Sequence, residues 1–250
     1  WAGRLSLPSA SRDKDTFTRT TVAGCGTADT GQAWTNNGGV AADYATTGTG
    51  GTLTLTAANS GRISTVPSIY KDQDLRVNVS VSQAATGASL YAGLIGRYVD
   101  ANNLYNARLA FTTTGTTILY IQSRVASVQT DLVTVNLPWT YVAGTVFGIR
   151  FNIQGRILSA RAWPIATATE PRIWHAQIED FSPLTGAGVG IGVKSVSGGA
   201  NTNVNPVYTY DNFETVDSQA FNVMRSQNGI IKSHLVGEDA RLDVPAYVEM

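Results

Sequence analysis

Charged side chains and cysteine are both scarce in this sequence. Its 250 residues include 18 lysines and arginines and 18 aspartates and glutamates, so 14% of the chain is charged and the formal net charge is zero. Proteins that bind nucleic acid concentrate positive charge, so we expect no nucleic-acid partner. The single cysteine, Cys25, excludes an internal disulfide, and its setting between Gly24 and Gly26 predicts a small structural thiol.

Long apolar runs and helical periodicity are missing as well. No stretch reaches the roughly 18 apolar residues of a membrane-spanning helix, so we expect no insertion into a membrane. No apolar pattern with the period of an α-helix continues for more than a turn or two. These absences favour a fold built from strands.

Catalytic patterns are also missing, and we expect no enzyme activity. Retaining glycoside hydrolases need two carboxyl groups about 5–5.5 Å apart, and no Glu-x-Asp-x-x-Glu run supplies such a pair on one strand. Glu179 and Asp180 are adjacent, so on a strand they point to opposite faces. The two histidines, His175 and His234, lie too far apart, without flanking ligands, to indicate zinc.

Short segments that alternate between apolar and polar residues recur along the chain. Threonine and valine, which favour pleated surfaces, are abundant, and 25 glycines suit numerous turns. We predict about twelve strands, which fits a two-sheet jelly roll. The clearest predicted strands are residues 13–19, 52–56, 75–81, 90–98, 105–111, 118–125, 145–153, 156–163, 188–196 and 208–216.

Three regions follow from this pattern: a leader over residues 1–12, a β-sandwich over residues 13–216 and an appendage over residues 217–250. Residues 211–216 resemble residues 15–17 in texture, so we expect them to lie side by side and bring the ends of the sandwich together. In the appendage, Asn228-Gly229 between two extended segments predicts a β-hairpin. This hairpin is too small to fold alone, so it must pack on the sandwich, on another copy or on a partner.

Several motifs of the sandwich resemble those of laminin-G/concanavalin A-like modules found in actinobacterial secreted proteins and in minor tail proteins of their phages. The matching segments are residues 15–19 (Asp-Thr-Phe-Thr-Arg), 24–29 (Gly-Cys-Gly-Thr-Ala-Asp), 34–35 (Trp-Thr), 98–108, 170–174 (Glu-Pro-Arg-Ile-Trp) and 211–213 (Asp-Asn-Phe). Residues 225–246 are similar to the C-terminal tail of actinobacteriophage minor tail proteins. One departure is Cys25, where that family often carries an aromatic residue.

The resemblance implies an all-β, concanavalin-like jelly-roll sandwich with a C-terminal β-hairpin appendage. It implies a structural minor tail protein of a siphophage, located at the tail tip of the virion, that displays a glycan-binding module for adsorption to the host. The implied partners are other tail-tip proteins, a host cell-surface glycan and further copies of the chain, with a trimer suggested by tail symmetry. Two alternatives stay open: a secreted actinobacterial carbohydrate-binding module and a tail spacer without a ligand.

Sugar-binding sandwiches combine an aromatic platform with polar groups that orient the hydroxyls. The candidate ligand-binding residues are Trp34, Tyr98, Asp100, Asn102, Asn103, Tyr105 and Arg108. Trp139 and Trp174 are further aromatic candidates, although Trp163 and Trp174 are more typical of core filling or of bracing the loop around Glu170-Pro171.

No cofactor is expected, and the metal question stays open. Calcium binds hard oxygen ligands. The aspartates that could supply them are Asp29, Asp43, Asp180 and Asp211. Their spacing singles none of them out, so calcium enters as a possibility implied by the family.

Overall fold

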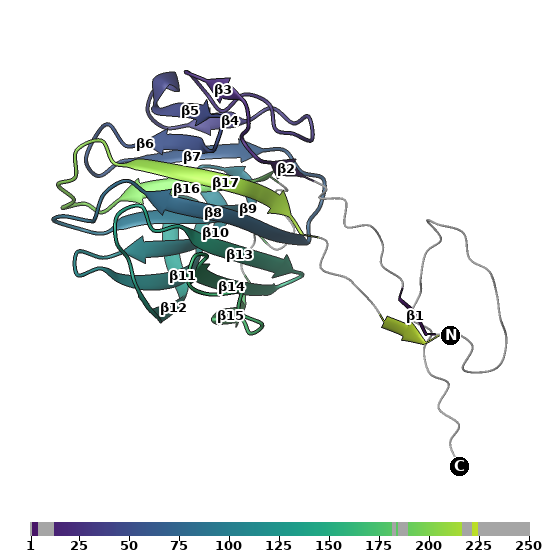
Figure 1. The fold of residues 1–250 in the computed structure, drawn as a ribbon. Helices are drawn as coiled ribbons and strands as arrows, with labels where there is room; N and C mark the ends of the chain where they lie inside the picture. Colours follow the sequence, from purple (N-terminus) through teal and green to yellow (C-terminus); the bar gives the residue numbers. More distant parts are fainter. Residues whose placement is uncertain (1, 5–12, 182–183, 185–189, 217–221, 225–250) are drawn as a thin grey trace, which may run out of the picture. The chain divides into compact units, whose positions relative to one another are not determined.

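Two antiparallel sheets make up the main body of the protein. The computed structural model describes residues 2–4, 13–181, 184, 190–216 and 222–224. Strands pair in two layers, a seven-stranded and a nine-stranded sheet (Figure 1). The predicted all-β class is confirmed, and a single 3-10 turn, η1 (Ala41–Asp43), is the helical segment of the described part.

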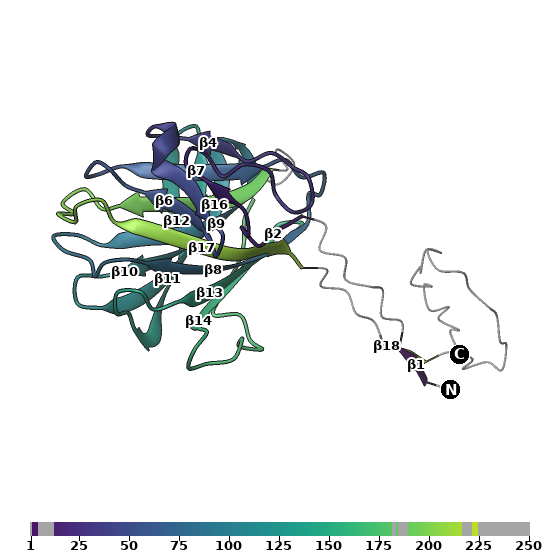
Figure 2. The same ribbon diagram turned by 45° about the horizontal axis from the view of Figure 1, so that its top comes forward.

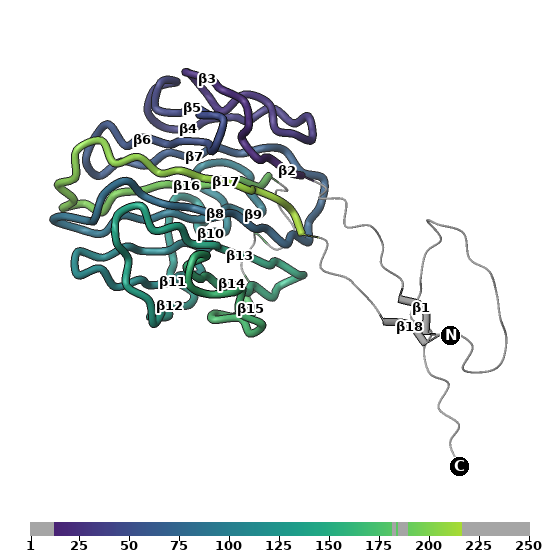
Figure 3. The backbone as a smooth tube through the Cα atoms, in the orientation of Figure 1, coloured from purple at the N-terminus to yellow at the C-terminus, as the bar shows by residue number. Residues whose placement is uncertain are grey.

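Seven strands form the first sheet. In spatial order they are β12 (Val128–Thr140), β11 (Thr116–Val125), β10 (Asn103–Phe111), β9 (Leu90–Asp100), β16 (Gly190–Ser197), β7 (Gly61–Val66) and β4 (Thr35–Asn37). Neighbouring strands from distant parts of the sequence, such as β9 and β16, can be followed in the backbone trace (Figure 3).

The second sheet contains most of the remaining strands. In order they are β15 (Ala176–Glu179), β14 (Ile157–Pro164), β13 (Phe147–Gln154), β8 (Gln73–Val81), β17 (Val207–Thr215), β6 (Gly51–Thr54), β5 (Tyr44–Thr47) and β3 (Thr20–Thr21), with β2 (Lys14–Asp15) paired to β17. The pairing of Asp15 with Phe213 confirms that the two ends of the sandwich lie side by side (Figure 2).

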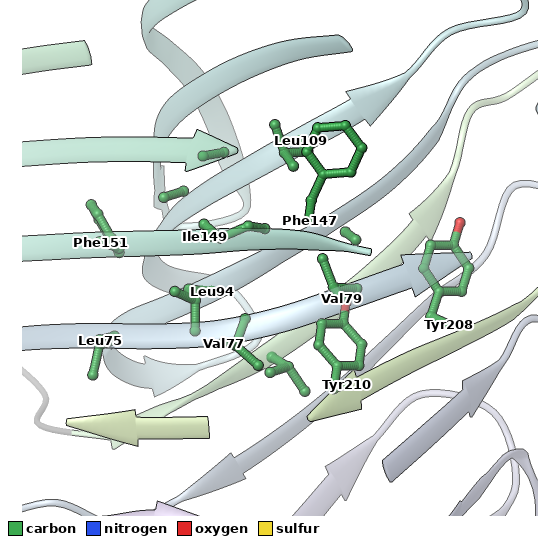
Figure 4. Packing of buried hydrophobic residues seen from close by; sticks show 14 of the residues in the cluster. Leu75, Val77, Val79, Leu94, Leu109, Phe147, Ile149, Phe151, Tyr208 and Tyr210 are labelled. Carbon is green, nitrogen blue, oxygen red and sulfur yellow. The ribbon is translucent and has the colours of Figure 1, made fainter. Parts of the chain in front are cut away.

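The core lies between the two sheets and is made by every second residue of the long strands. Phe147, Ile149 and Phe151 of β13 are fully buried, and they pack with residues of β8, β17, β9 and β10 (Figure 4). The residues between them face outward, which is the period of two that the sequence pattern predicted. The thiol of Cys25 is buried in this core, as expected, and burial raises its pKa.

The chain divides into two compact units, Ser9–Ser218 and a second unit made of Trp1–Pro8 with Gln219–Met250. In the second unit, β1 (Ala2–Arg4) pairs antiparallel with β18 (Asn222–Met224). The predicted hairpin around Asn228-Gly229 lies outside the described residues, so it stays a prediction. In the described part, no helix is long and apolar enough to span a membrane.

Candidate functional site

Strand register gathers polar side chains on the outer face of the seven-stranded sheet, the face turned away from the core. Gly93 of β9 pairs with Arg108 on one side and with Lys194 on the other, and Arg108 pairs with Tyr120. Residues opposite one another in neighbouring strands point to the same face. The neighbours of Arg108 in sequence, Ala107 and Leu109, belong to the core, which places this row outside it.

Arg108 is held between two tyrosine rings. Its guanidinium carbon lies 4.1 Å from the ring centre of Tyr91 and 5.2 Å from that of Tyr120. Its buried Nε donates no hydrogen bond. Burial lowers the pKa of Arg108, which nevertheless stays charged because an arginine is far from losing its proton at neutral pH. The stacking fixes the plane of a cation whose Nε–H has no hydrogen-bond partner.

The next row carries amides. Asn106 pairs in register with Gln122, and Gln122 with Asp131 of β12. The side-chain nitrogen of Asn106 donates to Gln122 Oε1 at 3.5 Å, and Gln122 donates in turn to Asp131 Oδ1. Asn106 Oδ1 is buried without a partner. A free acceptor therefore lies one row from the free donor of Arg108.

Two more cations complete this outer-face cluster, which we define as Tyr91, Asn106, Arg108, Tyr120, Gln122, Arg124, Asp131 and Lys194. Arg124 is on β11 with Tyr120 and Gln122, and its Nε is buried without a partner. Lys194 is 7% exposed. Its burial, together with the charges of Arg124 and Arg108, lowers its pKa to about 8. Neither Arg124 nor Lys194 forms an ion pair within the part of the chain that the structure describes.

Gly93 makes room for this arrangement. A Cβ at position 93 would lie 2.6 Å from the carbonyl oxygen of Ala107 and 2.6 Å from Asn106 Oδ1. Real Cβ atoms do not approach a backbone oxygen so closely, so the strand needs glycine there. Asn106 Oδ1 and the Cβ of Arg108 occupy the space that a side chain at position 93 would take.

A small apolar cluster adjoins the polar one. Ile63, Ile95 and Leu104 are buried outside the main core, and Tyr98 and Ala101 pack against them. Ile63 pairs with Lys194, and Ile95 with Asn106, so this cluster shares the outer face. It gives Tyr98 a packing role at the edge of the site.

The predicted site residues divide between this face and other places. Arg108 is central to the outer-face cluster. Asp100 Oδ1 accepts from the backbone N–H of Asn102 at 2.7 Å and from the amide of Asn103 at 3.0 Å, and Asn103 Oδ1 accepts from Ala126 N at 3.0 Å. The side chains of Asp100 and Asn103, with the backbone N–H of Asn102, hold the β9–β10 turn, and Asn103 ties it to the turn between β11 and β12.

Trp34 and Tyr105 lie in the main core instead. Trp34 is 8% exposed, and its Nε1 donates to Asp15 Oδ2 at 2.6 Å. Asp15 also receives two hydrogen bonds from Arg19, at 2.8 and 2.7 Å. Tyr105 is fully buried and its hydroxyl donates to Asp180 at 2.7 Å. Buried rings offer no surface to a sugar, so neither residue is included in the site.

Residues 170–174 cover the outer face of the other sheet. Glu170 accepts from Arg150 at 2.8 Å and from Arg161, and Arg76 lies 3.7 Å away. Partial burial alone would raise the pKa of Glu170, but these hydrogen bonds and positive charges lower it. Trp174 lies over Arg161, with the guanidinium carbon 4.3 Å from the ring centre. The bracing role predicted for Trp174 is confirmed.

The other tryptophans are explained by packing. The guanidinium carbon of Arg76 lies 5.5 Å from the ring centre of Trp163, which is 2% exposed. Trp139 is partly buried against the core and meets the ring of His175 edge-on at 5.6 Å. Neither presents a free aromatic platform.

The four candidate calcium ligands have separate partners. Asp43 is paired with Arg62 at 2.8 Å, Asp29 accepts from Thr16, and Asp211 accepts from Asn212. Asp180 accepts from the hydroxyl of Tyr105. Within the described ranges, no three His, Cys, Asp or Glu side chains come together as a metal site would require. The structure therefore brings no candidate calcium cage together there.

The other members of the outer-face cluster were not predicted from the sequence. The alternation of residues 103–111 and 116–125 could have marked Asn106, Tyr120, Gln122 and Arg124 as one outward set. Their combination with Tyr91 and Lys194 depends on strand register, which the sequence of any one strand does not contain.

No protein-family profile and no curated protein sequence matches the chain significantly. Solved structures with a similar fold include the carbohydrate-binding module CBM66 from Bacillus subtilis, with TM-score 0.51 and 11% identity over 72% of this chain and 92% of that one. A Bacillus licheniformis β-glucanase matches with TM-score 0.55 and 14% identity, over 82% of this chain and 97% of that one. The exoplasmic/lumenal domain of VIP36, bound to Ca²⁺ and Man3GlcNAc, matches with TM-score 0.51 and 11% identity, over 76% of this chain and 85% of that one.

At sequence identities of 11–14%, the structural similarity shows the fold alone. Residues of the main body form a concanavalin-like jelly-roll sandwich, as predicted.

Proposed function

We propose that this protein is a glycan-binding module that uses the outer-face cluster as its binding site. The proposal rests on one observation: hydrogen-bonding atoms without partners lie beside aromatic rings. Asn106 Oδ1 is a free acceptor, Arg108 Nε is a free donor, and Tyr91 and Tyr120 flank them. Both atoms are buried, so neighbouring side chains must shift before a sugar hydroxyl, which both donates and accepts, can bond to them, while a sugar ring packs on the tyrosine faces.

The descriptions of two similar structures agree with this proposal. One is a carbohydrate-binding module and another is a domain bound to Man3GlcNAc. Their identities to this chain are low, so the proposal depends on the residues of the cluster itself.

We propose further that binding is not followed by cleavage. The outer-face cluster contains one carboxylate, Asp131, and its Oδ1 is engaged by Gln122. Glycoside hydrolysis by either stereochemical route requires two carboxyl groups on either side of the scissile bond. The cluster supplies groups that hold a sugar and lacks the second acid that would cleave it.

The biological setting that we propose is the tail tip of a siphophage that infects actinobacteria. Motifs of the sandwich and residues 225–246 resemble minor tail proteins of such phages. In that setting the module would contact a host-surface glycan, and several copies, with a trimer as our guess, would multiply a weak affinity. Immunogold labelling of purified virions with an antibody to this chain tests the setting, and labelling absent from the tail would reject it.

Binding to isolated actinobacterial cell walls tests the function. We expect saturable binding of the full chain that soluble polysaccharide competes away. Arg108→Ala removes the stacked cation and should weaken binding at least about tenfold, as expected for a central contact residue. Arg172→Ala is the matched control, since this exposed arginine lies on the loop over the other sheet. An addition of EDTA shows whether calcium takes part.

Two results would contradict the proposal in different ways. Equal binding by both variants and the unaltered protein would move the site away from this face. No binding, even by an artificially multimerised protein, would favour the ligand-free tail spacer. A free secreted module is favoured if the antibody finds the chain in culture medium of uninfected cells.

A further inference from the structure

We propose that the outer-face cluster recognises a negatively charged group, a carboxylate or a phosphate, on its glycan. This inference rests on the proposed glycan-binding function and names the chemical class of the ligand. It predicts that an acidic glycan binds better than the same glycan with its charge removed.

Positive charge is in excess in the outer-face cluster. Arg108, Arg124 and Lys194 share the outer face, and none of them forms an ion pair within the described part of the chain. The remaining charged group is Asp131, whose Oδ1 accepts from Gln122. Burial raises the pKa of the Tyr120 phenol, which therefore adds no charge at pH 7. The cluster therefore carries excess positive charge in a chain whose net charge is zero.

Other buried or partly buried arginines are paired with a carboxylate, although Arg97 and Arg161 also keep one buried nitrogen without a hydrogen-bond partner. Arg19 bonds Asp15, Arg62 pairs with Asp43, and Arg150 bonds both Asp74 and Glu170. In each case a carboxylate of the chain forms an ion pair with a partly or fully buried guanidinium. Arg108 and Arg124 are also buried at Nε, yet neither forms an ion pair within the described part of the chain, and Asp131 acts on Arg108 only through its charge, which raises the pKa of the arginine against the larger lowering by burial.

Strand register places two of the cations on either side of Gly93. Arg108 and Lys194 flank Gly93 in register, on the strands on either side of it. Adjacent strands are about 4.8 Å apart, so the two Cα atoms are separated by about 10 Å. An ideal Cβ on Gly93 would lie 2.6 Å from Asn106 Oδ1 and 2.8 Å from Arg108 Cβ, so these groups cover the strand there, and an anion bound between the two cations would lie above them. A guanidinium fork and an ammonium together suit an oxygen-rich anion.

Burying the charge of Lys194 destabilises the folded protein. Lys194 is 7% exposed and lies near two other cations. A buried charge without a partner is unfavourable, and such groups are commonly retained for a functional reason. An anionic ligand would supply the missing counter-charge and so offset the unfavourable burial of Lys194.

The first experiment uses the unaltered full-length protein and a panel of matched glycan pairs. Oligogalacturonate is compared with its methyl ester, and phosphorylated oligosaccharides with their dephosphorylated forms. We expect at least one acidic member to bind tenfold or more tightly than its neutral partner, with an affinity that falls as salt is raised. The two kinds of pair separate a carboxylate ligand from a phosphate ligand.

A second measurement reads the site directly. The Nε–H signals of Arg108 and Arg124 should shift in nitrogen-proton spectra when glucuronate or inorganic phosphate is added, and glucose should leave them in place. Arg150 is the internal control, because its Nε already donates to Asp74 at 2.8 Å. Arg124→Met should weaken binding of the acidic member by a larger factor than binding of the neutral partner, and Arg172→Met should change neither.

The outcomes separate this inference from the proposed function. If acidic and neutral partners bind equally and at this face, the protein is a glycan-binding module and the anion inference is wrong. If no glycan and no cell wall binds, both are wrong. If the Nε–H signals of Arg108 and Arg150 shift together, the anion acts through general ionic strength and the inference is again wrong.

Discussion

Lys194, which we propose to bind an anionic ligand, lowers the stability of the folded protein because its charge is buried. Its pKa falls from an ordinary value of 10.5 to about 8 in the folded protein. Below pH 8 the lysine is charged in both the folded and unfolded states, and the folded state bears the full cost of burying the charge. Between pH 8 and 10.5 the unfolded state binds more protons, so this cost disappears as the pH rises.

Lys194→Met should therefore stabilise the protein at pH 7 while it removes binding of an acidic glycan. The pKa difference corresponds to a gain of about 3 kcal/mol at most. Urea unfolding at pH 7 and at pH 10.5 measures it, and the advantage of the variant should shrink at the higher pH. A variant that is less stable than the unaltered protein at pH 7 would show that Lys194 has a stabilising partner.

At the same scale, Arg108 and Trp34 were both predicted to bind ligand, and the structure places Arg108 on the outer face and Trp34 in the core. Arg108 was chosen for its position near a turn, and its stacking between Tyr91 and Tyr120 required register to be seen. Trp34 looked like a platform because indole rings serve in both roles. Its buried N–H is bonded to Asp15, which makes it a core residue with a polar handle.

Among the elements, the loop over residues 165–175 depends on one carboxylate. Glu170→Gln removes the charge that Arg150, Arg161 and Arg76 share. We expect a loss of about 1–3 kcal/mol at pH 7, less than for a fully buried pair because Glu170 is 21% exposed. Thermal unfolding with Glu179→Gln, an exposed acid on β15, as the control measures this loss.

The pH dependence of the same variant checks the cause. The pKa of Glu170 is lowered in the folded state, so its stabilisation is present above the ordinary pKa of a glutamate and is lost as pH falls through the lowered value. The difference between Glu170→Gln and the unaltered protein should vanish in acid. A difference that persists there would point to lost packing instead of lost charge.

The elements themselves were largely predictable because alternation survives in each long strand. The predicted strands at residues 90–98 and 105–111 correspond to β9 and β10. The long strand β12 was missed, since its exposed position at the sheet edge gives it no regular apolar pattern. The predicted strand at residues 13–19 was too long: β2 covers Lys14–Asp15, and Phe17 turns the chain with a φ of 50°.

For the whole molecule, the sandwich is closed by contacts between its own ends. Thr215 N donates to Asp13 O at 2.8 Å, and Asp13 N donates to Thr215 Oγ1 at 2.9 Å. The resemblance of residues 211–216 to the opening segment predicted this closure. The role of the terminal segments was inferred from their small size and from family resemblance. No contact described here tests that role, and it stays a prediction.

A fragment of residues 9–218 should therefore fold as a cooperative unit and keep the intrinsic affinity of the site. We expect its thermal midpoint to lie within a few degrees of that of the full chain, and its Kd for a soluble oligosaccharide to be unchanged. On intact cell walls the full chain should bind more tightly, by a factor on the order of 10² or more, if the terminal segments join several copies. Sedimentation of both proteins shows whether copies associate. Equal cell-wall binding by the fragment and the full chain would contradict an oligomerising role for the terminal segments, while loss of soluble-ligand affinity in the fragment would place part of the site outside the sandwich.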